Sequence, residues 1–132
     1  MVEDFWHIMS TLKSYRDLEV WRKSIDWVEQ IYRVSKAFPP EERFGLISQV
    51  RRAAVSVASN IAEGAARTGT GEFLQALSVA SGSLAEAETQ LIIANRLEML
   101  PTPEMSGLLE QADEISKMLG GLKRSLEARR QR

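Results

Sequence analysis

The stretch that decides the fold is residues 41–66, EERFGLISQVRRAAVSVASNIAEGAA. Apolar residues recur in it every three or four positions, which is the spacing of one helix face: Leu46, Val50, Ala54, Val57 and Ile61. Most residues between them are small, so a second helix can approach closely. Pro40 and the two glutamates after it suit a first helical turn. The stretch therefore predicts a helix over about 41–66.

The same periodicity predicts three further helices, over about 17–37, 71–97 and 103–127. Phe38-Pro39-Pro40 ends the first helix, because proline disfavours helical geometry in the residue before it. No alternating strand pattern competes. Four long amphipathic segments with short links predict an all-α fold, an antiparallel up-down-up-down four-helix bundle over 15–128. Residues 1–14 are expected to form an N-terminal tail or arm, and 129–132 a basic C-terminal end.

Composition narrows the possible functions. The 132 residues suit one domain, and the absence of cysteine excludes disulfides, thiolate metal sites and cysteine nucleophiles. Lys and Arg number 17 against 18 Asp and Glu, so any contact with nucleic acid must use a local patch. No apolar run approaches the ~20 residues of a membrane span, and the N-terminus lacks the features of a signal peptide. We expect a cytoplasmic protein without membrane contact.

The first predicted helix carries two neighbouring apolar stripes. One comprises Leu18, Trp21, Ile25, Val28 and Tyr32; the other comprises Val20, Trp27, Ile31 and Val34. A lone bundle buries one stripe per helix, so the second predicts self-association. The candidate interface residues are Val20, Trp21, Trp27 and Ile31. Two alternatives remain open: the helix sits deep in the bundle, or residues 1–14 fold over it.

Two polar stripes are candidates for a site. They comprise Gln49, Arg52, Ser56, Asn60 and Glu63 on the second helix, and Ser83, Glu86 and Gln90 on the third. If these edges face each other, Arg52, Glu63 and Glu86 can meet inside the bundle. A binding or catalytic pocket is one interpretation. We favour a structural hydrogen-bonded network that sets helix register.

The sequence offers no catalytic residues. The single histidine is His7, so a di-metal bundle site lacks its Glu-x-x-His motifs, and no serine lies beside an obvious base. Glu63 and Glu86 would make at most a poor oxygen-only metal site. We therefore expect neither enzymatic activity nor a metal or cofactor.

Basic residues gather in two parts of the chain. The candidate nucleic-acid-binding residues are Arg51, Arg52 and Arg67 around the end of the second helix, and Lys123, Arg124, Arg129 and Arg130 near the C-terminus. The plainer interpretation of the second group is favourable charge at a helix C-terminus. The alternative is a phosphate-binding patch with salt-dependent affinity.

Several strings together resemble one known family. They are QVRRAAVS at 49–56, SNIAEG at 59–64 followed by Arg67, DLEVW at 17–21, and SLAE at 83–86 running on to QL at 90–91. These strings resemble the four-helix-bundle 23S rRNA intervening-sequence proteins, a family that includes the accessory variability determinants of diversity-generating retroelements. The resemblance covers about residues 15–101.

The resemblance implies a bundle that assembles into a ring-shaped homopentamer in the bacterial cytoplasm, with a proposed role in nucleic-acid binding and no catalytic residues. The retroelement members are strongly basic, whereas this chain has a net charge of −1. We therefore expect an oligomeric, non-enzymatic scaffold that binds RNA or an RNA-associated protein. The alternatives are a protein–protein adaptor without nucleic-acid contact and an enzyme that uses the polar stripes.

Overall fold

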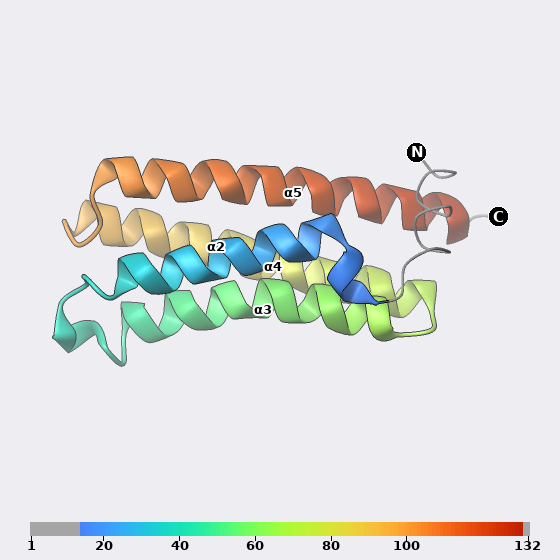
Figure 1. Cartoon of the computed structure of the whole chain (residues 1–132), viewed down its shortest axis with the longest axis horizontal. Coiled ribbons are helices and arrows are strands. Elements are labelled where there is room, and N and C mark those ends of the chain that lie inside the picture. The colour runs from blue at the N-terminus through green and yellow to red at the C-terminus, as the bar shows by residue number, and fades with distance from the viewer. Residues whose placement is uncertain (1–13, 131–132) are drawn as a thin grey trace.

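Four long helices dominate the computed structural model, which describes residues 14–130 (Figure 1). They are α2 (Glu19–Ser35), α3 (Leu46–Ala66), α4 (Thr70–Arg96) and α5 (Thr102–Arg130). Two short 3-10 turns, η1 (Tyr15–Asp17) and η2 (Pro40–Glu42), precede α2 and α3. The predicted N-terminal tail lies outside the described residues, except for Ser14. Within residues 14–130, no helix has an apolar stretch long enough to cross a membrane.

The start of α3 differs from the prediction. Pro40 to Glu42 form only a 3-10 turn, and Gly45 has non-helical dihedral angles (φ −109°, ψ −116°), so the α-helix begins at Leu46. The backbone N–H of Leu46 donates to Oε1 of Glu42 at 3.0 Å. A Cβ at position 45 would lie 2.6 Å from that oxygen. Glutamate and glycine together thus cap the helix, which begins five residues later than the proline pattern predicts.

The end of α5 also differs from the prediction. The helix continues to Arg130, so Arg129 and Arg130 belong to its last turn and not to a separate basic end. Positive side chains are favourable there, because the last carbonyl groups of a helix carry partial negative charge. The remaining predicted boundaries agree with the structure within about two residues.

One hydrophobic core unites the four helices. Neighbouring pairs are α2 with α3, α3 with α4, α4 with α5, and α5 with α2. Each helix contributes fully buried side chains to the centre: Trp27, Ile31, Val57, Ile61, Leu77, Leu91, Ile115 and Leu119. Figure 1 shows the helices lying side by side along a common long axis. Burial of these apolar surfaces is the main stabilising contribution to the bundle.

The α3 and α4 helices make the most extensive contact of any pair. Small buried residues line it, among them Ala54, Gly64 and Ala80. A Cβ added at Gly64 would lie 2.8 Å from Cβ of Ala76 and 2.9 Å from Cδ1 of Phe73. Gly64, the glycine of the SNIAEG string, therefore lets α3 and α4 pack closely, because a larger residue at this position would clash with α4.

Candidate functional surfaces

Part of the predicted polar network does form between α3 and α4. The hydroxyl oxygens of Ser56 and Ser83 lie 2.8 Å apart. Nδ2 of Asn60 donates to the backbone carbonyl of Ser56 at 2.8 Å and to its hydroxyl at 3.0 Å. These bonds satisfy polar groups at a close helix interface and hold α3 and α4 in one register.

A second polar cluster surrounds Gln90, which is 6% exposed. Its Nε2 donates to Oε1 of Gln49 at 3.5 Å and to Oε2 of Glu86 at 3.4 Å, both long distances for a hydrogen bond. Oε1 of Gln90 is buried and has no partner among the described residues. An unpaired buried acceptor is destabilising, so this part of the network is only partly satisfied.

The expectation that Arg52, Glu63 and Glu86 meet inside the bundle is wrong. All three side chains are exposed. Arg52 and Glu63 are separated by about 16 Å along α3, since an α-helix rises about 1.5 Å per residue. Glu63 contacts Arg67, and Glu86 contacts Gln90.

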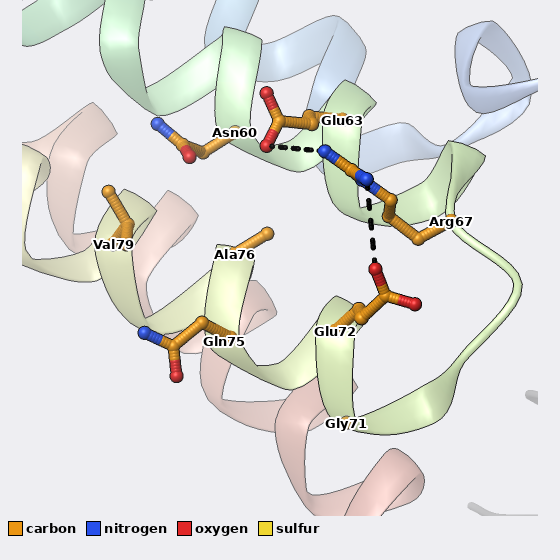
Figure 2. A pocket seen from close by; sticks show the side chains of 8 residues that line it. All are labelled: Asn60, Glu63, Arg67, Gly71, Glu72, Gln75, Ala76 and Val79. Carbon is orange, nitrogen blue, oxygen red and sulfur yellow. Dashed lines mark ion pairs between the residues drawn. The ribbon is translucent and has the colours of Figure 1, made fainter.

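The polar edge of α3 instead forms one wall of a surface groove of about 380 Å³ (Figure 2). Arg67 lies between two carboxylates, with Nη2 3.5 Å from Oε1 of Glu63 and Nη1 3.7 Å from Oε2 of Glu72. The other lining residues are Asn60, Gly71, Gln75, Ala76 and Val79. The three charged side chains are more than half exposed, so these ion pairs contribute little to stability. The sequence did not indicate Glu72, which the turn between α3 and α4 brings back toward Arg67.

Arg51 has a structural role. Its Nε donates to the hydroxyl of Ser35 at 2.8 Å, and its Nη2 donates to the backbone carbonyl of Tyr32 at 3.2 Å. The guanidinium also stacks over the Tyr32 ring, 4.6 Å from its centroid. Arg51 therefore caps the C-terminal end of α2 from the neighbouring helix. Its role in phosphate binding stays a prediction, and the contacts that the structure gives it all lie within the protomer.

The three arginines of α3 do not form one patch. Arg51 and Arg52 lie in the first half of α3. Arg67 directly follows the last residue of α3 and lies about 24 Å from Arg51 along the helix axis. Arg67 instead lies at the end of the bundle that also contains the end of α5 (Figure 1). The guanidinium of Arg130 reaches Gly71 at the start of α4.

We call this group the basic end: Arg67, Lys123, Arg124, Arg129 and Arg130. Nζ of Lys123 donates to the hydroxyl of Ser81 at 2.7 Å, so its partner in this bond is a neutral group. Arg124, Arg129 and Arg130 are exposed on the last turns of α5. Four of the five predicted basic residues that meet here come from a single helix, α5.

Charge is divided along α5. Its first half, residues 102–114, contains acidic residues and no basic ones, whereas residues 115–130 contain five basic residues and one acid, Glu127. Because α5 is one continuous helix, the two halves lie toward opposite ends of the bundle. Lys23 of α2 pairs with Glu114, and Lys117 pairs with Asp113 at 3.4 Å.

Glu88 faces the acidic half of α5. Burial raises the pKa of its carboxyl group, and the negative charge of Asp113 raises that pKa further. Burial and a nearby like charge both disfavour the ionised form of a carboxyl group. Among residues 14–130, no cluster of three or more His, Asp or Glu side chains has the arrangement of a metal site.

The interface prediction for α2 requires a correction. Val20, Trp27 and Ile31 are 4%, 1% and 0% exposed within a single protomer, so they are core residues and have no surface left for another subunit. The other stripe of α2 faces outward: Trp21, Ile25, Val28 and Tyr32 are partly or substantially exposed. Of the four candidate interface residues, only Trp21 therefore keeps surface outside the protomer core.

Exposed apolar side chains gather on α4. Of the eight large apolar residues exposed in the described part of the chain, Val79, Ile92 and Ile93 belong to this helix, and Leu97 is the residue that follows its end. Val79, Ile93 and Leu97 lie within about 40° of one direction around it, as expected for residues 14 and 18 positions apart. Apolar residues aligned in this way indicate a contact surface more than a random scatter does.

Comparison with known proteins agrees with this architecture. A solved structure, a protein of unknown function from the S23 ribosomal protein family of Bacteroides thetaiotaomicron, superposes with a TM-score of 0.74 at 24% identity, covering 79% of this chain and 97% of that one. This likeness concerns the fold alone. A comparison with curated proteins found no match. The family model described as 23S rRNA-intervening sequence protein matches residues 16–121. The chain therefore belongs to the 23S rRNA-intervening sequence protein family.

Proposed function

We propose that the chain is a non-enzymatic cytoplasmic scaffold that self-associates and contacts RNA, or a protein bound to RNA, through its basic end. In this proposal the protomer is an antiparallel up-down-up-down bundle, and the assembly is a ring-like homo-oligomer, a pentamer by resemblance to the family. The observation that carries the RNA contact is the concentration of positive charge on the last turns of α5.

The basic end suits phosphate groups better than any other described surface. Arg124, Arg129 and Arg130 project from two consecutive turns, and arginine presents several donors to phosphate oxygens. Glu127 is the one acid within this stretch of α5. The wider chain is nearly neutral, so binding through this region depends on local charge and weakens steeply with salt.

A gel-shift titration with a structured 23S rRNA fragment, at low and moderate salt, tests the RNA contact. We expect replacement of Arg124, Arg129 and Arg130 by glutamine to weaken binding at least tenfold. The slope of log affinity against log salt should fall by about 0.7–0.9 for each phosphate group that the variant no longer neutralises. The matched control replaces Lys36, Arg43 and Arg96 by glutamine, because these exposed residues carry the same charge at the other end of the bundle. Absence of binding at low salt would contradict the proposal.

Self-association rests on the apolar residues of α4. Burying Val79, Ile93 and Leu97 against another subunit removes apolar area from water, and a lysine there would oppose this burial. We expect light scattering coupled to gel filtration to report an oligomer for the natural chain and a smaller species for Ile93→Lys. Val55→Lys is the matched control, since Val55 of α3 is 39% exposed, close to the 41% of Ile93. A natural chain that is monomeric at micromolar concentration would overturn this part of the proposal.

A protein–protein adaptor is the second candidate. Arg51 and Arg67, both candidate RNA-binding residues, have partners within the protomer, and the net charge is −1. Affinity capture from extract, with and without ribonuclease, separates the two functions. A partner that stays bound after ribonuclease treatment supports the adaptor, whereas one that is released supports the RNA-linked scaffold.

A further inference from the structure

Two helix edges on the surface of the bundle carry charges in opposite order. On α3, the exposed residues Arg52 and Glu63 are eleven positions apart, and on α5 the exposed residues Asp113 and Arg124 are also eleven positions apart. We call these pairs the α3 edge and the α5 edge. Eleven residues make about three helical turns and 16 Å, so the two charges of each pair lie on one side of their helix. The edges therefore match in spacing and are opposite in sign.

The two helices run in the same direction, since both end at the same end of the bundle (Figure 1). Within residues 14–130 they make no contact with each other, whereas α2 and α4 each contact both. The α3 edge and the α5 edge of one protomer therefore cannot pair with each other. They can pair only between two copies of the chain.

Side-chain bonds fix the relative height of the two edges along the bundle. The hydroxyl groups of Ser56 and Ser83 lie 2.8 Å apart and set α3 against α4, and the bond from Lys123 to Ser81 sets α5 against α4. Ser81 precedes Ser83 by two residues, about 3 Å along α4, so Lys123 is level with about residue 58 of α3. Each charge of the α5 edge thus lies within about one turn of the height of the opposite charge on the α3 edge.

The α3 edge borders the surface groove between α3 and α4. Figure 2 shows the carboxylates of Glu63 and Glu72 on either side of the Arg67 guanidinium. The lining residues include two carboxylates and one guanidinium, so the groove favours a further cation. Val79 also lines the groove and is 44% exposed. The groove is therefore continuous with the apolar surface of α4 that carries the proposed self-association.

The α5 edge is open to a neighbouring helix. A Cβ at Gly120 would lie 3.4 Å from a guanidinium nitrogen of Arg124 and would meet no other helix within 4 Å. Lys117 lies on the same edge and pairs with Asp113 at 3.4 Å, but both side chains are more than two thirds exposed, so this ion pair is weak. On the facing side of the groove, the exposed Glu86 is near the height of both, so it meets one acid and one base.

We propose that α5 of one copy packs beside α3 of a second copy, in the same direction, with Arg124 at Glu63 and Asp113 at Arg52. Because the two surfaces differ, the contact is heterologous and repeats from copy to copy. Rotation about an axis parallel to the bundle leaves the height of every residue unchanged, so edges at equal height suit a closed ring. This inference rests on the proposed self-association and names the surface that meets the α3–α4 groove. Of the basic end, it uses only Arg124 and leaves the last turn of α5 to the proposed RNA contact.

Disulfide trapping tests the register, because the natural chain contains no cysteine. The full-length variant Glu63→Cys with Arg124→Cys is oxidised mildly, and the linked chains are analysed by non-reducing electrophoresis and peptide mass spectrometry. The matched control is Arg52→Cys with Arg124→Cys, whose positions the proposed register holds about 16 Å apart, too far for a disulfide. We expect disulfides between chains to join positions 63 and 124 at least tenfold faster than positions 52 and 124.

The other trapping results would overturn the proposal. Equal rates in the two variants, or no disulfide in either, would show that the edges do not meet in this register. Faster trapping of positions 52 and 124 would show that α3 and α5 meet in opposite directions. Disulfides that join position 63 to position 63 of a second copy would indicate a two-fold contact instead.

Charge reversal gives a second test without cysteine. We expect Glu63→Arg and Arg124→Glu each to raise the concentration at which the oligomer dissociates at least fivefold, measured by sedimentation velocity. The two reversals together should return it to within about twofold of the natural value, which also excludes misfolding as the cause of the single losses. Glu41→Arg is the control, because this exposed residue of η2 lies on neither edge.

The result of the double reversal separates this inference from the self-association on which it rests. Losses that add in the double variant, with the natural chain still an oligomer, would overturn the pairing of the two edges and leave self-association through α4 intact. A natural chain that is monomeric at micromolar concentration would contradict both.

Discussion

The indole N–H of Trp27 donates a hydrogen bond to the backbone carbonyl of Leu108 at 3.0 Å, joining α2 to α5. Trp27 is 1% exposed, so the bond forms inside the core. Nearer the surface, this pair of helices is joined by polar contacts, including the bond from Nε2 of Gln111 to Oε1 of Gln30 at 3.0 Å. Trp27 therefore supplies both a hydrogen-bond donor and a large buried apolar side chain at this junction.

Replacing Trp27 by phenylalanine is expected to destabilise the fold by about 2–4 kcal/mol, since it removes a buried hydrogen bond and leaves unfilled volume. Urea denaturation monitored by circular dichroism measures the free energy of unfolding. Trp21→Phe serves as the control, because Trp21 is only partly buried. A larger loss for the Trp21 variant would show that the assignment of core and surface on α2 is wrong.

Alanine in place of Gly64 should lower the stability of the fold, whereas alanine in place of Gly82 should raise it. Gly64→Ala should destabilise by about 1–3 kcal/mol, because its Cβ would meet Ala76 and Phe73 at the α3–α4 contact. Gly82→Ala in α4 should stabilise by about 0.5–1 kcal/mol, because nothing lies within 4 Å of the added carbon and alanine favours the helix. Thermal unfolding of both variants measures the two changes in stability. A change in the same direction for both would contradict the close approach of α3 and α4 at Gly64.

Replacement of Arg51 on α3 should lower stability more than replacement of its neighbour Arg52. Arg51→Gln is expected to lower stability by about 1 kcal/mol, because the side chain no longer caps the end of α2 at Ser35 and Tyr32. Arg52→Gln, which removes the same charge from an exposed side chain, should change it by less than about 0.5 kcal/mol. Arg51→Lys should recover little, because lysine lacks the planar fork of donors. Chemical denaturation of the three variants makes the comparison.

The turn after α4 offers a stabilising substitution. Glu98 has a φ of 62°, a left-handed conformation that glycine adopts without strain. The N–H of Met99 bonds the carbonyl of Ala94 at 2.8 Å, and that of Glu98 bonds the carbonyl of Asn95 at 3.0 Å, the pattern of a Schellman cap. Glu98→Gly should therefore raise stability by about 0.5–1 kcal/mol. Glu98→Ala keeps the strain, so a gain of equal size in its unfolding free energy would exclude this explanation.

The stability of the bundle should depend on pH through Glu88. Its pKa in the folded state is raised, first by burial and then by Asp113, so the folded chain holds this proton more tightly than the unfolded chain. Its contribution to stability is therefore lost as pH rises from the pKa of the unfolded chain through that of the folded chain. Glu88→Gln should stabilise the protein at neutral pH, with the gain shrinking as the pH falls through the folded pKa toward the pKa of the unfolded chain. Denaturation between about pH 3.5 and 7, with Glu41→Gln as an exposed control, measures this; a gain that grows on acidification would contradict it.

Local spacing was sufficient to predict the helices of this protein. Apolar periodicity located α2, α4 and α5 within about two residues at their predicted starts, because such a pattern depends only on the 3.6-residue repeat. The start of α3 was harder, since its cap is the Glu42 side chain acting across Gly45. The sequence did not predict the C-terminal cap of α4, because Glu98 occupies a position where glycine is usual.

The candidate site depended more on the fold. Sequence spacing correctly placed Ser56 and Asn60 on one edge of α3, and the structure pairs that edge with Ser83. Spacing could not show that Arg52 and Glu63 are exposed to solvent. It shows which residues share an edge of a helix, but not which part of that edge a neighbouring helix covers.

By itself, the sequence determined an all-α chain of four long helices, its family, and the two apolar stripes of α2, because each of these is written in short-range spacing and residue type. Only the tertiary structure decided which stripe faces the core, that Arg51 caps the end of the preceding helix at Ser35, and that α3 and α5 end at the same end of the bundle. The physical reason is that a helical period shows which side chains share a face, whereas the packing of neighbouring helices decides where that face points.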